Sequence, residues 1–468
     1  MNYHIHHTEV PTMPESTTTP IVCQSTPHAT LVALGVKVQQ LDLFHPIREQ
    51  VHIKQKTVRY TPIDKLYDAW IAILAGAHGL VEVNTRLRSD PALQAAFGRT
   101  GCAEQSVIQD TLDACDATTV QQMEQALTTI FQQHSQAYRH DYTQHLQILD
   151  IDMTGLPCGP KAAFATKGYF AKQRNRRGRQ LGRVLATRYH ELVTEQLLPG
   201  TEQLPKALRP LVEATEQVLA LDAARRAQTL IRVDGGGGSV DDINWLLERD
   251  YAVLGKEYSG KRARKLAATV AAWVDDPRVP GRQVGWVPGP APEYVRPVVR
   301  VAVRCPKKNG QWGMGVLLAS ADARLVPTAV GAGQPSIAQV LTTVYQYDAR
   351  GGGIETANKE DKQGLGIGKR NKKRFAAQQV VGQLGRLAHN LVVWARQWLG
   401  PEAPGVKQLG VKRLVRDVFH VNGLVERDGT GRIRRIVLNQ AHCYARRLLV
   451  ALQALVASEH VAVSLGET

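Results

Sequence analysis

The stretch from residue 145 to residue 258 alternates between strand patterns and helix patterns, which limits the folds open to this chain. HLQILDIDMTG (145–155), GRVLATRYHEL (182–192), AQTLIRVDGGGGS (227–239) and YAVLGKEY (251–258) have the apolar alternation or the β-branched composition of strands. Helix patterns stand between them at 204–227 and 239–250. Strands that alternate with helices predict a mixed α/β sheet.

Other segments flank or interrupt this region. A chain of 468 residues is too long for one ordinary hydrophobic core, so more than one structural unit is expected. The start is rich in Thr, Pro and His, which is typical of disorder, and helical patterns follow it. The predicted units are a disordered tail at 1–28, a mainly helical domain at 29–140, the mixed α/β unit at 141–400 with a β-rich insertion at about 277–330, and a C-terminal hairpin and helix at 401–468.

Two glycine-containing segments carry predictions about local geometry. Asn309-Gly310 in KKNGQW predicts a type I′ hairpin turn, because both residue types accept positive φ. The glycines at 351–353 lie in YDARGGGIETANKEDK (347–362), after the insertion and before a helical pattern. They predict a pivot between the two, since glycine tolerates backbone conformations that other residues avoid.

The excess of positive charge predicts nucleic acid as the partner. Lys and Arg total 58 against 42 Asp and Glu, which gives a net charge of +16 and a pI near 9.6. Clustered Lys and Arg release counterions from phosphates, so DNA or an anionic membrane would suit such a surplus. The sequence has no window of about 18 uninterrupted apolar residues, which argues against the membrane alternative.

Cysteine usage and the N-terminus predict a cytoplasmic location. The six cysteines are scattered and form no CxxC pair, which argues against a zinc ribbon or a disulfide framework. The N-terminal residues lack the charged-then-apolar order of a secretory signal. His4, His6 and His7 are interpreted as part of a polar tail rather than as a metal site.

Three acidic residues are candidates for metal-dependent chemistry: Asp152 in LDIDMTG, Asp234 in IRVDGGGGS, and Glu355. Carboxylates at strand ends, with small residues next to them, are the ligands that a two-metal phosphoryl-transfer site requires. Asp150 and Asp152 are two residues apart and share a sheet face, so the pattern leaves both open as the first ligand. An aspartate after a strand also serves as a turn former or helix cap, and this alternative stays open for Asp234.

Two basic runs stand close to these acids in the sequence. Residues 160–190 contain nine Lys or Arg and no acidic residue, and residues 369–374 contain five basic residues in six positions. A charge run often forms only a solvated surface, but two runs that follow two candidate catalytic acids favour phosphate contacts. The candidate DNA contacts in these runs are Arg174, Arg176, Arg177, Lys369 and Arg370.

LDIDMTG, RVDGGGGS and YDARGGGIETANKEDK together resemble the motifs of the DDE transposases of bacterial insertion sequences, in the cut-and-paste group with a Tyr-Arg-Glu-Lys signature. The resemblance covers about residues 60–440, including NTRLRSDPALQAAFG in the helical region. It implies an α/β, RNase H-like mixed sheet as the catalytic core, with a β-rich insertion between the second Asp and the Glu. It also implies that the preceding helical domain binds DNA.

The resemblance assigns roles to individual residues. Asp152, Asp234 and Glu355 are expected to bind two Mg²⁺ ions, with Mn²⁺ as a substitute, and Tyr347, Arg350 and Lys362 are expected to contact DNA at the ends of the element. The implied reaction is Mg²⁺-dependent hydrolysis at the inverted-repeat ends, after which the freed 3′-hydroxyl attacks target DNA. A homodimer is expected because two ends must be paired, with residues from 401 onward as the contributor.

In the family, two, three and six residues separate the Tyr, Arg, Glu and Lys of the signature, whereas here the gaps are two, four and six. If the segment were already helical at Arg350, the extra residue would rotate this arginine by about 100° relative to Glu355. The glycines offer one way to absorb the difference. Glu355 and Lys362 are two helical turns apart and are expected to share a helix face.

Two alternative functions stay open, and so does the identity of an aromatic residue that would hold a flipped base. An RNase H-like DNA nuclease without strand transfer would need the same acids, and a non-catalytic DNA-binding regulator derived from a transposase would need only the basic residues. In several members of the family an aromatic residue of the insertion helps to hold a flipped base. Trp286 and Trp312 are the candidates here, with packing as the alternative for each.

Overall fold

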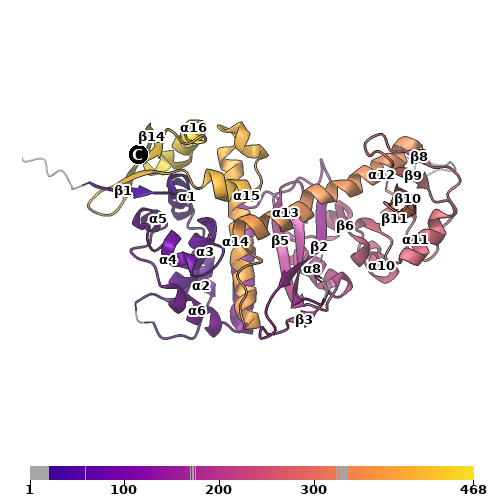
Figure 1. Cartoon of the computed structure of the whole chain (residues 1–468), viewed down its shortest axis with the longest axis horizontal. Helices are drawn as coiled ribbons and strands as arrows, with labels where there is room; N and C mark the ends of the chain where they lie inside the picture. Colours follow the sequence, from indigo (N-terminus) through magenta and orange to yellow (C-terminus); the bar gives the residue numbers. More distant parts are fainter. Residues whose placement is uncertain are drawn as a thin grey trace, which may run out of the picture.

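The computed structural model describes residues 21–57, 59–168, 170, 173, 175–322, 325 and 336–467. The N-terminal helices form one side of the molecule, the central sheet lies beside them, and the predicted insertion lies at the far end (Figure 1). The long helix α14 (Phe375–Leu399) runs between the N-terminal helices and the sheet and contacts both (Figure 1). None of the helices in the described ranges is both long and apolar enough to cross a membrane.

The central sheet is built around β2 (Gln147–Pro157). This strand pairs antiparallel with β4 (Arg177–Ala186) on one side and parallel with β6 (Thr229–Val233) on the other. The sheet continues from β4 to β5 (Glu191–Pro199) and β3 (Thr166–Lys167), and from β6 to the parallel strand β7 (Ala252–Lys256). The prediction of a mixed α/β sheet is therefore confirmed, and the parallel strands β6 and β7 end at one edge, level with Asp152 of β2.

The prediction of one strand over 182–192 is wrong. β4 ends at Ala186, the chain turns at 187–190, and β5 begins at Glu191 and returns along β4. The turn residues include no Gly, Pro, Asn or Asp, so no turn signal marks it, and His190 closes the turn with a φ of 58°.

Helices cover both faces of this sheet. On one face, α8 (Leu204–Leu219) packs Leu208 and Leu211 against Ile151 and Val184 in a shared apolar core. On the other face lie α14 and a helical run that begins with α12 (Ile337–Arg350). The shorter elements between β6 and the insertion are η1 (Gly235–Gly237), α10 (Val240–Glu248) and α11 (Gly260–Ala267), and α9 (Ala223–Ala227) precedes β6.

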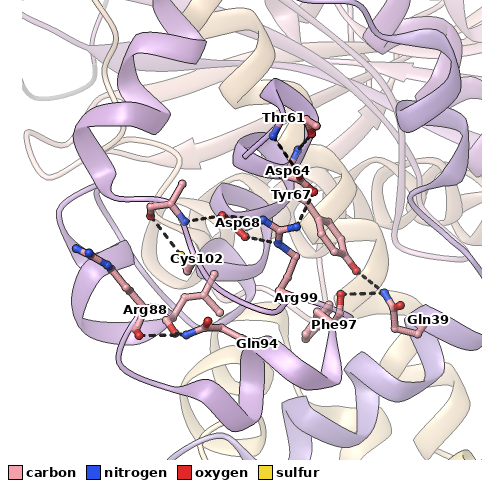
Figure 2. Close-up of polar contacts among 12 residues, drawn as sticks. Gln39, Thr61, Asp64, Tyr67, Asp68, Arg88, Gln94, Phe97, Arg99 and Cys102 are labelled. Atoms are coloured by element: carbon pink, nitrogen blue, oxygen red, sulfur yellow. Dashed lines mark hydrogen bonds and ion pairs between the residues drawn. The ribbon is translucent and has the colours of Figure 1, made fainter. Parts of the chain in front are cut away.

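The N-terminal helices enclose a buried polar cluster (Figure 2). Asp68 accepts hydrogen bonds from Arg99 Nε at 2.8 Å and from the backbone N–H of Ala103 at 2.9 Å, while Arg99 also pairs with Asp64 at 2.5 Å. A buried carboxylate is stable only when paired, so this cluster ties the helix that carries Asp64 and Asp68 to the loop that carries Arg99 and Ala103. The helices are α1 (Ala29–Gln40), α2 (His45–Gln50), α3 (Pro62–Leu74), α4 (Glu82–Arg86), α5 (Pro91–Ala96), α6 (Gln105–Ala114) and α7 (Ala117–His134).

The two ends of the described chain meet in a second sheet with the order β1-β12-β13-β14. Its first strand, β1 (Val22–Thr26), lies within residues 1–28, which were predicted to be a disordered tail, so the predicted tail is too long. The predicted domain boundary at residue 401 does not match the packing either, because α16 (Ala445–Val456) contacts α1 and shares a hydrophobic core with the N-terminal helices. The C-terminal elements are η4 (Pro404–Gln408), α15 (Val411–Arg413), η5 (Leu414–Val418), β12 (Gly423–Arg427), β13 (Ile433–Asn439), α16 (Ala445–Val456), η6 (Ala457–Glu459) and β14 (Ala462–Gly466).

The predicted insertion is β-rich and extends the central sheet rather than forming a separate one, since β11 pairs antiparallel with β7. Its hairpin is not a type I′ turn. Gly310 has a φ of 76°, but Asn309 does not have a positive φ, and Lys307 pairs with Gln311 across a wider loop. The strands are β8 (Val274–Asp275), β9 (Gln283–Trp286), β10 (Val298–Pro306) and β11 (Trp312–Ser320).

Candidate active site

The two candidate aspartates lie side by side at the edge where the parallel strands end. Asp152 is in β2, and Asp234 directly follows the last residue of β6. Ile151 pairs with Val233 in the parallel register, so the residue after each stands at the same level of the sheet. The parallel register of β2 and β6 therefore brings these two carboxylates together.

An open groove of about 720 Å³ runs past both aspartates. Its walls also include Lys362, Lys369 and the first residue of α8, Leu204. The groove thus combines carboxylates with lysines, an arrangement suited to a metal-dependent reaction on a phosphate backbone.

Asp234 also acts as a cap, as the alternative interpretation expected. Its Oδ1 accepts a hydrogen bond from the backbone N–H of Gly236 at 2.8 Å and caps the short 3₁₀ turn η1. The glycine run lets the chain turn tightly at the groove, because a Cβ on Gly238 would lie 2.0 Å from the carbonyl oxygen of Lys256. The capping role therefore holds this carboxylate at the rim of the groove.

Asp150 and Asp152 share the sheet face but differ in their surroundings. Asp150 is fully buried, and its oxygens accept hydrogen bonds from Arg232 at 2.6 and 2.8 Å and from Thr187 at 2.6 Å. Asp152 keeps 16% of its side chain exposed and lines the groove. Because Asp150 is fully buried and does not line the groove, whereas Asp152 does, the geometry favours Asp152 as the metal ligand.

The glycines at 351–353 lie at a kink between two helices. After α12 come η2 (Gly351–Glu355), α13 (Thr356–Glu360) and η3 (Asp361–Leu365). The backbone at Gly353 is not helical, with a φ of −89° and a ψ of −107°. The predicted pivot therefore takes the form of a kink at Gly353, where the chain packs against Asp150 of β2.

The π-helical turn absorbs the extra residue between Arg350 and Glu355. A π turn inserts one residue into an α-helix, so positions five apart meet where positions four apart otherwise would. Arg350 Nη1 lies 3.2 Å from Glu355 Oε1, and Arg350 Nη2 donates to Asp152 Oδ1 at 3.0 Å. Arg350 is therefore not rotated away from Glu355, and its guanidinium bridges two of the three candidate acids.

Gly353 allows this kinked helix to approach the sheet. A Cβ on Gly353 would lie 2.6 Å from Asp150 Oδ2 and 3.1 Å from a methyl group of Thr187. A Cβ on Gly352, one residue earlier, would meet no heavy atom within 4 Å. The two neighbouring glycines therefore form a matched pair for a test.

We expect Gly353→Ala to lower the free energy of unfolding by roughly 1–3 kcal/mol, because the added methyl group displaces a buried carboxylate. Gly352→Ala should be neutral or slightly stabilising, since alanine favours helix more than glycine does. Urea unfolding followed by circular dichroism measures both. Equal effects of the two substitutions would show that the approach of the helix to Asp150 does not constrain the fold.

Burial and neighbouring charges shift the pKa values of three residues at the site. Burial raises the pKa of Asp152 to about 6, Arg350 opposes this shift, and Asp234 adds to it. Burial alone would lower the pKa of Arg350, but the charges of Asp152 and Asp234 raise it overall. Burial lowers the pKa of Lys362, and the nearby Arg183 lowers it further. These shifts are typical of functional sites, where charged groups are brought together at partial burial.

A hydrogen-bonded network that was not predicted from the sequence holds the Asp152 carboxylate in place. Asn358 donates to Asp152 Oδ2 at 3.2 Å. Arg183 lies next to Asn358 and is almost fully buried, with Asp361 at 2.6 Å and Glu195 at 3.1 Å. The one signal in the sequence is spacing, since Asn358 follows Glu355 by three residues and shares its helix face.

The predicted DNA contacts differ in accessibility. Arg176, Arg177 and Lys369 are exposed. Arg370 is buried, with its guanidinium donating to the carbonyl oxygens of Leu365 and Ala77, so this placement does not fit the predicted contact with DNA. The sequence cannot separate neighbouring basic residues in this way, because burial of Arg370 depends on a carbonyl nearly 300 positions away. Arg174 lies outside the described residues.

The signature tyrosine and the two tryptophans are also placed. Tyr347 is half-buried against the sheet, and burial raises its pKa to about 12. Trp286 packs against the same core, which supports the packing interpretation for this residue. Trp312 is 40% exposed, with the Arg304 guanidinium 4.5 Å from its ring.

The donor chemistry of this site fits a hard divalent cation. Asp152 and Asp234 lie close enough for the charge of Asp234 to raise the pKa of Asp152, and a cation would relieve this repulsion. Glu355 lies against Arg350 instead, with 58% of its side chain exposed. Within the described part of the chain, no three His, Cys, Asp or Glu side chains converge as a ready metal site.

Searches for related proteins found one kind of similarity. Neither a family model nor a curated protein sequence matches the chain. Among solved structures, the chain is similar to the piggyBac transposase in a cryo-EM structure of its synaptic complex with hairpin DNA. The TM-score is 0.45 and the sequence identity 14%, over 84% of this chain and 79% of that chain. The functional assignment therefore rests on the residues and geometry of this chain.

Proposed function

We propose that this protein is a DDE transposase that cleaves the inverted-repeat ends of an insertion sequence and joins their 3′-hydroxyl ends to target DNA. The observation that carries the proposal is the meeting of Asp152 and Asp234 at one sheet edge, in a groove that Lys362 also lines. Glu355 stands on the helix that crosses this edge and is tied to Asp152 through Arg350.

We propose an RNase H-like core on the strand arrangement. Three successive antiparallel strands, β2, β4 and β5, are extended on the other side of β2 by the parallel strands β6 and β7. Helix α8 connects β5 to β6 across one face, and the helix that carries Glu355 lies on the other. This arrangement supports the proposed fold family from the topology alone.

In the proposed mechanism, Asp152, Asp234 and Glu355 would hold two Mg²⁺ ions. When bound, the ions supply charge stabilisation for hydrolysis and transfer at the phosphodiester. Asn358 and Arg350 orient Asp152 through hydrogen bonds at 3.2 and 3.0 Å. The protein itself contributes positioning and charge neutralisation, which is the main requirement of phosphoryl transfer.

The remaining side chains of the groove suit DNA binding. Lys362 and Lys369 line the groove and offer charge to the phosphates that flank the scissile bond. The proposed partners are the inverted-repeat ends, the target DNA and a second copy of the chain in the synaptic complex. The proposed location is the bacterial cytoplasm, at the nucleoid.

Metal removal tests this proposal. With duplexes taken from the DNA that flanks the coding sequence, we expect Mg²⁺ or Mn²⁺ to support cleavage and strand transfer, and EDTA to abolish both. DNA binding measured by fluorescence anisotropy should change by less than about threefold in EDTA, because the lysines supply most of the phosphate contacts. Gel electrophoresis separates cut, joined and intact strands.

The same gels separate the competing functions. Cuts without joined products would favour the nuclease, and a Mg²⁺-independent footprint without strand breaks would favour the regulator. Cleavage that persists in EDTA would contradict a metal-dependent site at Asp152 and Asp234.

A further inference from the structure

The two basic runs of the sequence lie side by side, and one buried arginine joins them. Arg179 is 1% exposed and donates to the carbonyl oxygens of Ala163 at 2.7 Å, Lys372 at 3.0 Å and Lys373 at 3.1 Å. The backbone N–H of Ala163 also donates to the carbonyl of Lys373 at 2.8 Å. Segments about 200 residues apart in sequence therefore form one surface.

We call this surface the basic platform and define it by its exposed cations. Ion pairs neutralise exposed arginines elsewhere, such as Arg434 with Asp428 and Arg413 with Asp417. Among the described residues, no ion pair involves a cation of the platform, so its charge is available to an anionic partner. The members are Lys161, Lys167, Arg176, Arg177, Lys369, Lys373 and Arg374.

An exposed aromatic ring stands within these charges. Phe164 is 56% exposed, and its ring meets that of Phe375 edge to face with 4.7 Å between the centroids. The backbone of Phe164 has a φ of 58°, which is unfavourable for a bulky residue and is retained mainly where it serves a function. Phe375 is held in turn by the Arg179 guanidinium, 5.6 Å from its ring. The ring of Phe164 is therefore held in place by Phe375, while much of its surface is exposed to solvent.

The platform borders the groove of the candidate active site. Lys369 belongs to both, and Asn371 donates to the carbonyl oxygen of Pro157, a residue of the groove wall, at 3.1 Å. A DNA strand that passes Asp152 can therefore continue over the platform. Phosphates along it would meet the cations, and bases would meet the ring of Phe164.

We propose that Phe164 stacks on an unpaired nucleobase of the DNA strand whose phosphates the basic platform neutralises. The inference rests on the proposed function, since DNA in the groove supplies the strand. Aromatic rings beside cations are the usual means of binding single-stranded nucleic acid, because every base has a stacking face. The stacking contact adds affinity for unpaired bases independently of the salt-sensitive phosphate contacts.

The test uses a fluorescently labelled duplex with a single-stranded overhang that contains 2-aminopurine, in EDTA so that cleavage cannot occur. We expect the wild type to quench 2-aminopurine, and Phe164→Ala to lose the quenching and bind this DNA about tenfold more weakly. The salt dependence of Phe164→Ala should match the wild type. Lys373→Ala should keep the quenching but lower the slope of log K against log salt by about 0.9.

Three controls keep the result specific. Phe164→Trp should restore quenching and affinity, and Val81→Ala, at a residue 66% exposed outside the platform, should change nothing. Phe164→Ala should bind a fully paired duplex as the wild type does. Circular dichroism and the melting temperature confirm that each variant is folded.

Unchanged quenching in Phe164→Ala, or an equal loss of affinity on paired and overhanging DNA, would overturn the inference. If the wild type cleaves DNA with Mg²⁺ while Phe164→Ala keeps its quenching, only this inference fails. If the wild type quenches 2-aminopurine through Phe164 but never cleaves, the proposed function fails and the stacking site stands. A wild type that binds no DNA would overturn both.

Discussion

Asp234→Asn is expected to reduce Mg²⁺-dependent end cleavage by about 10⁴-fold, the scale of removing one essential group of a catalytic set. DNA binding should change by less than about threefold, because the phosphate contacts come from lysines and arginines. The substitution is conservative for the fold. Asparagine is as good a capping residue as aspartate, so the side chain at 234 can still accept the hydrogen bond from the backbone N–H of Gly236. Single-turnover cleavage and fluorescence anisotropy measure the two effects.

A second aspartate near the same edge supplies the control. Asp241 is 88% exposed on α10 and pairs with Arg209 at the surface, away from the groove walls. Asp241→Asn should leave cleavage unchanged, and Asp152→Asn should reproduce the loss seen for Asp234→Asn. Residual cleavage of more than about a tenth of the wild-type rate in Asp234→Asn would rule this residue out as a metal ligand.

Arg232→Met is expected to lower the free energy of unfolding by about 3–5 kcal/mol, because it leaves the buried carboxylate of Asp150 without its cation. Asp150 is fully buried and Arg232 is 3% exposed, so water cannot replace the lost partner. Arg232 also donates to the carbonyl of Gln346 at 2.6 Å, and the same substitution loosens the end of α12. Equilibrium unfolding in urea measures the loss.

Exposed and double variants isolate the cause. Arg296→Met breaks a pair with Asp250 in which both side chains are more than 40% exposed, and it should cost no more than about 1 kcal/mol. The double variant Asp150→Asn with Arg232→Met removes both charges and should recover part of the loss. If Arg232→Met costs as little as Arg296→Met, then Asp150 is not held as a buried ion pair. Its carboxylate would then be open again as a metal ligand.

The local order of strands and helices could be predicted from the sequence because apolar periodicity is a property of neighbouring residues. β6, β7 and α8 formed within the predicted segments, and β2 runs two residues past its predicted end at 155. The juxtaposition of Asp152 and Asp234 did not follow from this order, because β3, β4 and β5 lie between β2 and β6 in the chain and local patterns do not say which strands pair. The turn inside 182–192 was missed because its residues include no Gly, Pro, Asn or Asp, the usual turn formers.

Long-range pairing could not be predicted in the same way. Asp150 and Arg232 are 82 positions apart, and their pairing separates the buried aspartate from the one in the groove. Burial of Arg370 and exposure of its neighbour Lys369 are likewise decided by which segment covers each side chain. The second sheet joins residues near both ends of the chain, and no local pattern predicts that β1 pairs with β12.

The sequence by itself determined the mixed α/β architecture, the basic charge and the positions of the three acids along the chain. Tertiary structure alone decided how the acids face one another. The kink at Gly353 accommodates the extra residue before Glu355, so Arg350 is not rotated away from Glu355. The kink is possible because Gly353 lets the chain lie against Asp150 and Thr187. The physical reason is that backbone geometry at such a kink depends on what the helix packs against, which the residues of the kink do not encode.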